Sequence, residues 1–213
     1  ATGMALVYRA NRVVNFAQGE LGLVPAALAL DLILFSGLSY VLAFAVGLAA
    51  AAVVGAVVEL AIVRRFFRSS RLILAVATIG LAQALAFGSL MVPRIWGEEP
   101  VTSAIDAPFR WRAEVAPLVF DADHVVAWVV VPLALLAVAA FLRATDVGVA
   151  VRAAADRADR AALLGIPVGR LHTCVWAIAA VLSFVAVFLQ AGIVGVPLGS
   201  PVGLTVLLSA LAA

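Results

Sequence analysis

Five polar side chains that fall within or beside apolar stretches are the candidates for handling a solute in this chain. Three belong to the segment NFAQGE at 15–20, and two lie inside the uncharged run 72–92. Polar side chains in such places either hydrogen-bond to neighbouring helices or face a cavity that suits a small polar solute. Both interpretations remain open. The candidate pathway residues are Asn15, Gln18, Glu20, Thr78 and Gln83.

Carboxylates inside an apolar run are candidates for function by default, because burying a charge in hydrocarbon is expensive. Asp31 and Glu59 are the two in this chain, and both fall near predicted helix ends, where a side chain can reach the interface. Glu59 can also pair with Arg64 or Arg65 in the next turn. Proton-driven transporters usually show more buried charge than this, which weakens that mechanism.

The titratable residues give no catalytic or metal-binding pattern. By the topology derived below, His124 and His172 lie at opposite membrane faces, so they cannot share a dyad or a metal ion. The single cysteine, Cys174, excludes an intramolecular disulfide and a cysteine-rich metal site. No serine has a predicted base at the same depth. The sequence therefore predicts no enzyme activity, no cofactor and no metal.

Hydrophobic residues make up 66% of the 213 positions and charged residues 12%, with a mean hydropathy of +1.19. Soluble domains carry roughly half apolar and a quarter charged residues, so this composition places the chain in a membrane. The apolar runs are long and continuous, which favours helices over a β-barrel. In one of them, Gly47 and Gly55 would permit close helix packing. We expect one all-α domain, a polytopic transmembrane helical bundle, with spans at about 21–36, 40–63, 72–92, 125–142, 173–191 and, in part, 202–213.

Arginines set the orientation of these spans. The loop Arg64–Arg71 nets +4 from four arginines, and the loop Arg143–Arg170 nets +2 from five arginines less three aspartates. The loop 94–124 nets −3 from three arginines less six acids. The positive-inside rule then predicts the first two loops in the cytoplasm and the third outside. A single span separates consecutive loops, so the span count and the charges agree on a plasma-membrane protein.

The predicted cytoplasmic loop 143–171 contains a helix. Thr145 or Asp146 can cap its start, Gly165 fits a helix C′ position, and Pro167 prevents continuation. One of its stripes is charged, and another is small and apolar. A solvated connector and a docking element for another protein both fit this pattern. The charged stripe is Arg152, Asp156 and Arg160, and the apolar stripe is Val151, Ala154, Ala158, Ala161 and Leu164 or Gly165.

All 14 basic residues are arginines, and the absence of lysine excludes the phosphate-binding GxxxxGK[ST] loop. If ATP drives this protein, another chain binds the ATP. The arginines cluster at membrane edges, so the net charge of +2 does not indicate nucleic-acid binding. Membrane lipid is the partner that the composition itself implies.

Three stretches together resemble the membrane-spanning permeases of branched-chain amino acid ABC importers. The family's segment ending in Asn-Phe-Ala-His-Gly-Glu is similar to VYRANRVVNFAQGELG, with Gln18 in place of the histidine. Its glutamate-containing helix end, arginine-rich turn and next helix are similar to VVELAIVRRFFRSSRLILAVATIGLA. Its cytoplasmic loop, with an Ala-Leu-Leu-Gly-Ile ending, is similar to DVGVAVRAAADRADRAALLGIPVGRL. The resemblance covers most of the chain in order and spacing.

The resemblance implies partners and a docking site in the plasma (inner) membrane of bacteria. In this family a second permease subunit pairs with the first, ABC ATPase subunits dock beneath, and an extracytoplasmic solute-binding protein delivers substrate. ABC importers carry a Glu-Ala-Ala-x-x-x-Gly docking signature; counting back from Gly165 puts Asp159 at the glutamate and Arg160 at an alanine. The implied docking residues of this coupling helix are Asp159, Arg160, Ala161, Ala162, Leu163, Leu164, Gly165 and Ile166.

The predicted function is the permease subunit of an ATP-driven importer for branched-chain or related amino acids, working by alternating access. The alternative is a stand-alone secondary transporter or channel for a small polar solute such as an amide or urea. The apolar run before Arg9 is too short to span, and the last run stops at Ala213, so we also expect a fragment truncated at both ends.

Overall fold

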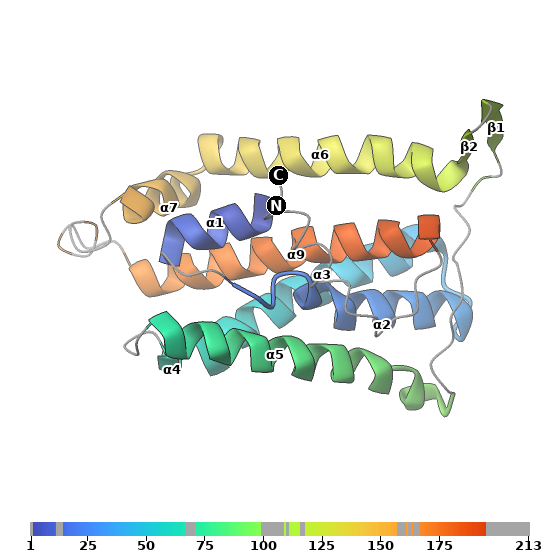
Figure 1. Ribbon diagram of the computed structural model, residues 1–213. Coiled ribbons are helices and arrows are strands. Elements are labelled where there is room, and N and C mark those ends of the chain that lie inside the picture. The colour runs from blue at the N-terminus through green and yellow to red at the C-terminus, as the bar shows by residue number, and fades with distance from the viewer. Residues whose placement is uncertain are drawn as a thin grey trace.

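The computed structural model gives a bundle of long helices that lie side by side (Figure 1). The structure describes residues 2–11, 15–66, 71–98, 109, 111–115, 118–156, 161, 163 and 167–194. Its first elements are α1 (Thr2–Asn11), the 3₁₀ turn η1 (Glu20–Gly22), α2 (Leu23–Leu34), α3 (Tyr40–Val58), the π-turn η2 (Glu59–Val63), α4 (Arg64–Phe66) and α5 (Arg71–Met91). The later ones are the 3₁₀ turn η3 (Pro93–Trp96), β1 (Arg112–Val115), β2 (Leu118–Asp121), α6 (Ala122–Ala144), α7 (Asp146–Asp156) and α9 (Val168–Val194).

Four helices in the described part of the chain are long and apolar enough to cross a membrane. They have 23 to 27 residues each and run over Tyr40–Phe66, Leu72–Trp96, Ala122–Ala144 and Gly169–Ile193. At 1.5 Å of rise per residue, the shortest reaches about 35 Å, which exceeds the ~30 Å hydrocarbon core of a bilayer. The prediction of a polytopic helical membrane bundle is confirmed. The partial span predicted at 202–213 lies outside the described residues.

The span predicted at 21–36 takes a different form. Most of this stretch is α2, whose 12 residues extend about 18 Å, too short for a membrane span. Residues at successive helical positions are at most 3% exposed, so α2 is buried all round: Leu23, Ala26, Ala27, Ala29 and Leu30. The surrounding elements are α3, α5 and α9. The prediction of a full span is therefore corrected to a short helix enclosed by protein.

The helices α3 and α9 pack most closely where glycines remove side-chain bulk. A Cβ atom at Gly47 would come within 2.3 Å of the Phe184 ring, and one at Gly55 within 2.5 Å of the Trp176 carbonyl oxygen. Neither position has room for a side chain, so the predicted role of these two glycines in close packing is confirmed. Phe184 is fully buried and lies against Phe44, with ring centroids 5.5 Å apart.

A hairpin and α6 form an outer layer of the bundle. The strands β1 and β2 pair antiparallel inside the predicted external loop, and the sequence did not predict them. Within α6, none of the apolar 18-residue window is buried, so among the four spans this helix offers the most surface to lipid or to another membrane protein. The hairpin marks one end of the bundle and α7 the other, and we call these the hairpin end and the α7 end (Figure 1).

Candidate functional site

The segment Asn15–Gly22, here called the connecting segment, leads into α2 and contains three of the five candidate pathway residues. Asn15 is 1% exposed and holds the turn at its start, because its Oδ1 accepts a hydrogen bond from the Ala17 N–H at 3.0 Å. Its Nδ2 donates to Oε1 of Gln18 at 3.5 Å. The two amide side chains are therefore neighbours inside the protein.

The connecting segment is tied to the middle of α9 by two side chains. Gln18 donates through Nε2 to the carbonyl oxygen of Ala179 at 3.0 Å. Ser183 donates to the Gly19 carbonyl oxygen at 2.8 Å and accepts from the Gly22 N–H at 3.1 Å. These bonds join parts of the chain more than 160 residues apart. Sequence reasoning missed Ser183, although a serine inside the apolar run 173–191 was the available signal.

The same segment is tied to α5 through Thr78. The Phe16 N–H donates to Thr78 Oγ1 at 3.3 Å, and that hydroxyl donates to the Ala75 carbonyl oxygen at 2.7 Å. Thr78 is 2% exposed, whereas Gln83 is exposed. Residues five apart in an α-helix point about 140° apart around its axis, which explains the difference. The structure therefore brings Asn15, Gln18 and Thr78 together and leaves Gln83 on another face of α5.

Two carboxylates lie on the short helical stretch that follows. Glu20 is 6% exposed and Asp31 is 3% exposed. For Asp31, the Oδ2 atom has no hydrogen-bond partner among the described residues. Buried carboxylates are expensive in a membrane protein and commonly mark a functional region. Together with the amides of the connecting segment, they form a polar strip along a helix that is otherwise packed in apolar side chains.

A second polar cluster lies at the α7 end. Glu59 pairs with Arg64, with Oε1 and Nε 3.5 Å apart, so the ion pair anticipated for Glu59 is present. The other carboxylate oxygen, Oε2, accepts a hydrogen bond from the Thr173 hydroxyl at 2.6 Å. Arg64 also donates through Nη2 to the Gly169 carbonyl oxygen at 3.2 Å. This cluster ties the end of α3 to the first turns of α9, and the sequence gave no sign of the role of Thr173.

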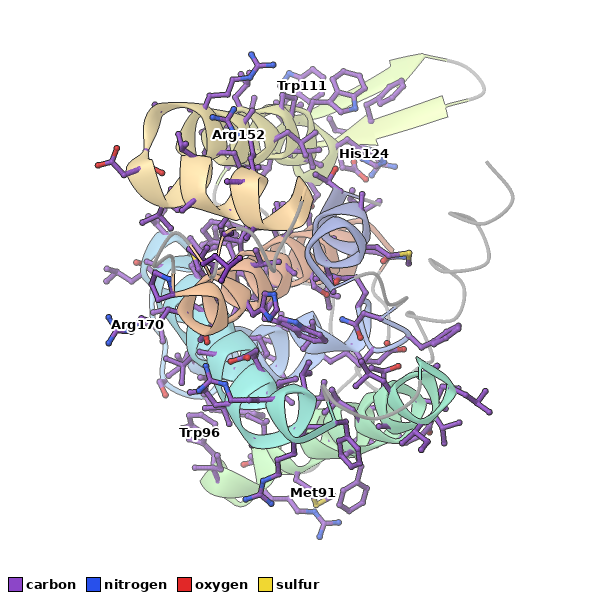
Figure 2. The ribbon with its side chains drawn as sticks, turned by 90° about the vertical axis from the view of Figure 1, so that its left-hand side faces the viewer. Met91, Trp96, Trp111, His124, Arg152 and Arg170 are labelled. Carbon is purple, nitrogen blue, oxygen red and sulfur yellow. The ribbon has the colours of Figure 1, made fainter. Side chains whose placement is uncertain are left out.

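The predicted docking helix is described in its first half. Thr145 caps α7, because its Oγ1 accepts from the Gly148 N–H at 3.0 Å. The apolar stripe is buried at Val151 and Ala154, while Arg152 of the charged stripe is exposed at the periphery of the α7 end, as is Arg170 (Figure 2). The sequence predicted this division between a buried and an exposed stripe.

Only two of the eight predicted docking residues are described. Ala161 is 3% exposed and belongs to the same apolar cluster as Val151 and Ala154. Leu163 is 87% exposed. The other six lie outside the described residues: Asp159, Arg160, Ala162, Leu164, Gly165 and Ile166.

The histidines lie far apart. His124 is in the first turn of α6 at the hairpin end, where its Nδ1 accepts from the Asp121 N–H at 3.3 Å and completes a helix cap (Figures 1 and 2). His172 is in the first turns of α9, at the α7 end. Within the described ranges, no three His, Cys, Asp or Glu side chains are grouped as metal ligands.

Four long apolar helices around a short enclosed one, with polar side chains confined to a strip and to one end, define a multi-pass helical membrane protein. Over residues 1–213 the chain matches the family described as branched-chain amino acid transport system / permease component. The chain belongs to this permease family, and its role is that of a transport component. No curated protein and no solved structure matches it significantly.

Proposed function

We propose that this chain is the permease subunit of an ATP-binding-cassette importer that moves branched-chain or related amino acids by alternating access. Its membership of the permease family is the observation that carries the proposal. The chain has no lysine for a nucleotide-binding loop, so ATP would be hydrolysed on separate subunits. The proposed assembly adds ABC ATPase subunits, a second permease subunit and an extracytoplasmic solute-binding protein, in a bacterial plasma membrane.

We infer that the ATPase subunits contact residues 159–166. Two observations support this location. The preceding helix α7 is capped and packed by its apolar stripe, so it offers a fixed platform. The isobutyl group of Leu163 is 87% exposed, outside the candidate spans, where a partner would bury it. Burying a leucine side chain that is otherwise left in water contributes roughly 1.5–3 kcal/mol.

We infer that the connecting segment and the start of α2 face the solute during transport. The amides of Asn15 and Gln18 and the hydroxyl of Thr78 supply donors and acceptors, and the carboxylate of Glu20 suits the ammonium group of an amino acid. In the present arrangement these groups bond to α5 and α9. Rocking of the helices would exchange such bonds for bonds to solute. Gln83 lies on an exposed face of α5 and is not included.

The test of docking uses Gly165→Arg and the charge reversal Asp159→Lys, each co-expressed with the candidate ATPase subunit. Both changes are expected to reduce co-purification of the ATPase and ATP-dependent uptake of labelled leucine by at least about tenfold, as expected for a contact worth roughly 1.4 kcal/mol or more. Glu98→Lys is the matched control, because it reverses an exposed acid at the hairpin end.

Normal complex formation and normal uptake by both variants would remove the docking proposal. Uptake by the wild-type chain reconstituted alone, insensitive to ATP, would favour a secondary transporter or channel for a small polar solute such as an amide or urea. Competition of labelled leucine by unlabelled amino acids, amides and urea then identifies the substrate class.

A further inference from the structure

The transmembrane helix Tyr40–Phe66 contains a π-turn, η2, near its α7 end. In this turn the Arg64 N–H donates to the Glu59 carbonyl oxygen, five residues back. Side chains five apart in an α-helix diverge by about 140°, and the wider π-turn closes most of that angle. The π-turn is therefore what places Glu59 and Arg64 on the same side of the helix. Such turns inside α-helices are frequent at functional sites.

Glu59 and Arg64 bind α9 through complementary contacts. The Glu59 side chain is 3% exposed, and its two oxygens are engaged by Arg64 and by the Thr173 hydroxyl. Arg64, half exposed, also reaches the Gly169 carbonyl oxygen. The Thr173 hydroxyl lies 3.2 Å from that same carbonyl oxygen. Hydrogen bonds to charged groups are shorter and roughly twice as strong as neutral ones, so this cluster joins the two helices firmly.

The helix α9 connects this cluster to the connecting segment without a break. It begins at Val168 and runs to Val194, so Thr173, Ala179 and Ser183 belong to one helix. At 1.5 Å per residue, Thr173 lies about 9 Å along the axis from Ala179 and about 15 Å from Ser183. The latter two residues hold Gln18 and the ends of η1. A displacement of the first turn of α9 therefore reaches the connecting segment through a rigid element.

We propose that Glu59 is a positioning residue for transport: it locks the π-turn of α3 to the first turns of α9, so that both helices move together when the segment before Val168 is displaced. The proposal rests on the proposed function, because the displacing force is the docked ATPase. The residues that touch solute are not Glu59 or Thr173. They act through α3 and α9, which enclose α2.

The experiment uses the complete importer in proteoliposomes, with labelled leucine outside and ATP inside the ATPase compartment. Thr173→Val removes the hydroxyl at nearly constant volume, and Thr173→Ser retains it. Glu59→Gln keeps an acceptor for Thr173 and removes the charge. Arg64→Gln is compared with Arg65→Gln, the exposed neighbouring arginine. Uptake is measured against leucine concentration, per mole of assembled complex, together with ATP hydrolysis.

Thr173→Val, Glu59→Gln and Arg64→Gln are expected to lower the maximal uptake rate by roughly 2- to 30-fold, the range found for residues that couple distant sites. The half-saturating leucine concentration and the amount of bound ATPase stay within about twofold, and the ATP hydrolysed per leucine rises. Thr173→Ser and Arg65→Gln keep wild-type values. A purely structural role would instead lower the amount of assembled complex and leave the ratio of ATP to leucine unchanged.

Wild-type maximal rate and wild-type ratio in assembled Thr173→Val and Glu59→Gln complexes would overturn the proposal. Equal losses in Thr173→Val and Thr173→Ser would overturn it as well, because the hydroxyl would then be irrelevant. Failure of the proposed function reads differently: wild-type protein without bound ATPase and with ATP-insensitive uptake refutes both inferences at once. Bound ATPase with unaltered variants refutes the role of Glu59 alone.

Discussion

Replacing Ser183 by alanine should loosen the hold of α9 on the connecting segment. The hydroxyl makes two hydrogen bonds, to the Gly19 carbonyl oxygen at 2.8 Å and from the Gly22 N–H at 3.1 Å. Hydrogen bonds between membrane helices average about 0.6 kcal/mol and reach about 1.7 kcal/mol. Two such bonds give an expected loss of about 1–3 kcal/mol in the free energy of unfolding. Cavity formation adds little, because only one oxygen atom is removed.

Ser89→Ala is the matched control. Ser89 is also buried, at 1% exposed, but its hydroxyl donates to the Ala86 carbonyl oxygen within α5. Removing a bond within one helix leaves the contacts between segments intact, so we expect a loss of about 0.5 kcal/mol or less. The measurement is unfolding of the purified chain in a denaturing-detergent titration, followed by circular dichroism. Equal losses for the two serine variants would refute the reasoning that Ser183 joins α9 to the connecting segment.

Three further outcomes follow from the packing and the charges. Gly47→Ala should destabilise the protein by about 1–3 kcal/mol in the same titration, because its Cβ would collide with an aromatic ring, whereas Gly80→Ala, with open space around it, should be neutral or up to about 1 kcal/mol more stable. Thr145→Ala should cost about 1 kcal/mol and speed hydrogen exchange of the first turn of α7 about fivefold; unchanged exchange would contradict the cap. In a cysteine-free background, Glu98→Cys and Arg152→Cys should react with an impermeant thiol reagent from opposite sides of the membrane; labelling from one side would contradict the charge-based orientation.

The sequence predicted the class of fold because long uncharged runs have one stable arrangement in a bilayer. It failed at 21–36, where the residues are as apolar as in a true span. Whether such a stretch faces lipid or protein depends on its neighbours in space. Residues of α2 such as Ala26 and Leu30 are covered by α3, α5 and α9, and that enclosure has no local signature. The alternation of charged loops survives this correction, because a short enclosed helix adds no arginines.

The candidate pathway set was partly predictable. The difference between Thr78 and Gln83 was available from their spacing alone, since five residues rotate a side chain to another face of α5. The contact of Gln18 with Ala179 was not, because it joins residues 161 positions apart. The π-turn that aligns Glu59 with Arg64 was equally invisible: its residues ELAIV are ordinary helix formers, and the wider turn is stabilised by contacts with Gly169 and Thr173.

The enclosure of α2 has a consequence for how the chain is made. Its partners α3 and α5 follow soon after it, but α9 emerges from the ribosome about 145 residues later. Until then the connecting segment has no acceptor at Ala179 and no hydroxyl at Ser183, so its amides and the Glu20 carboxylate have to stay near water or the insertion machinery. Nascent chains stopped before α9 should therefore carry α2 at the bilayer surface, open to protease, and only release of α9 should draw it inside.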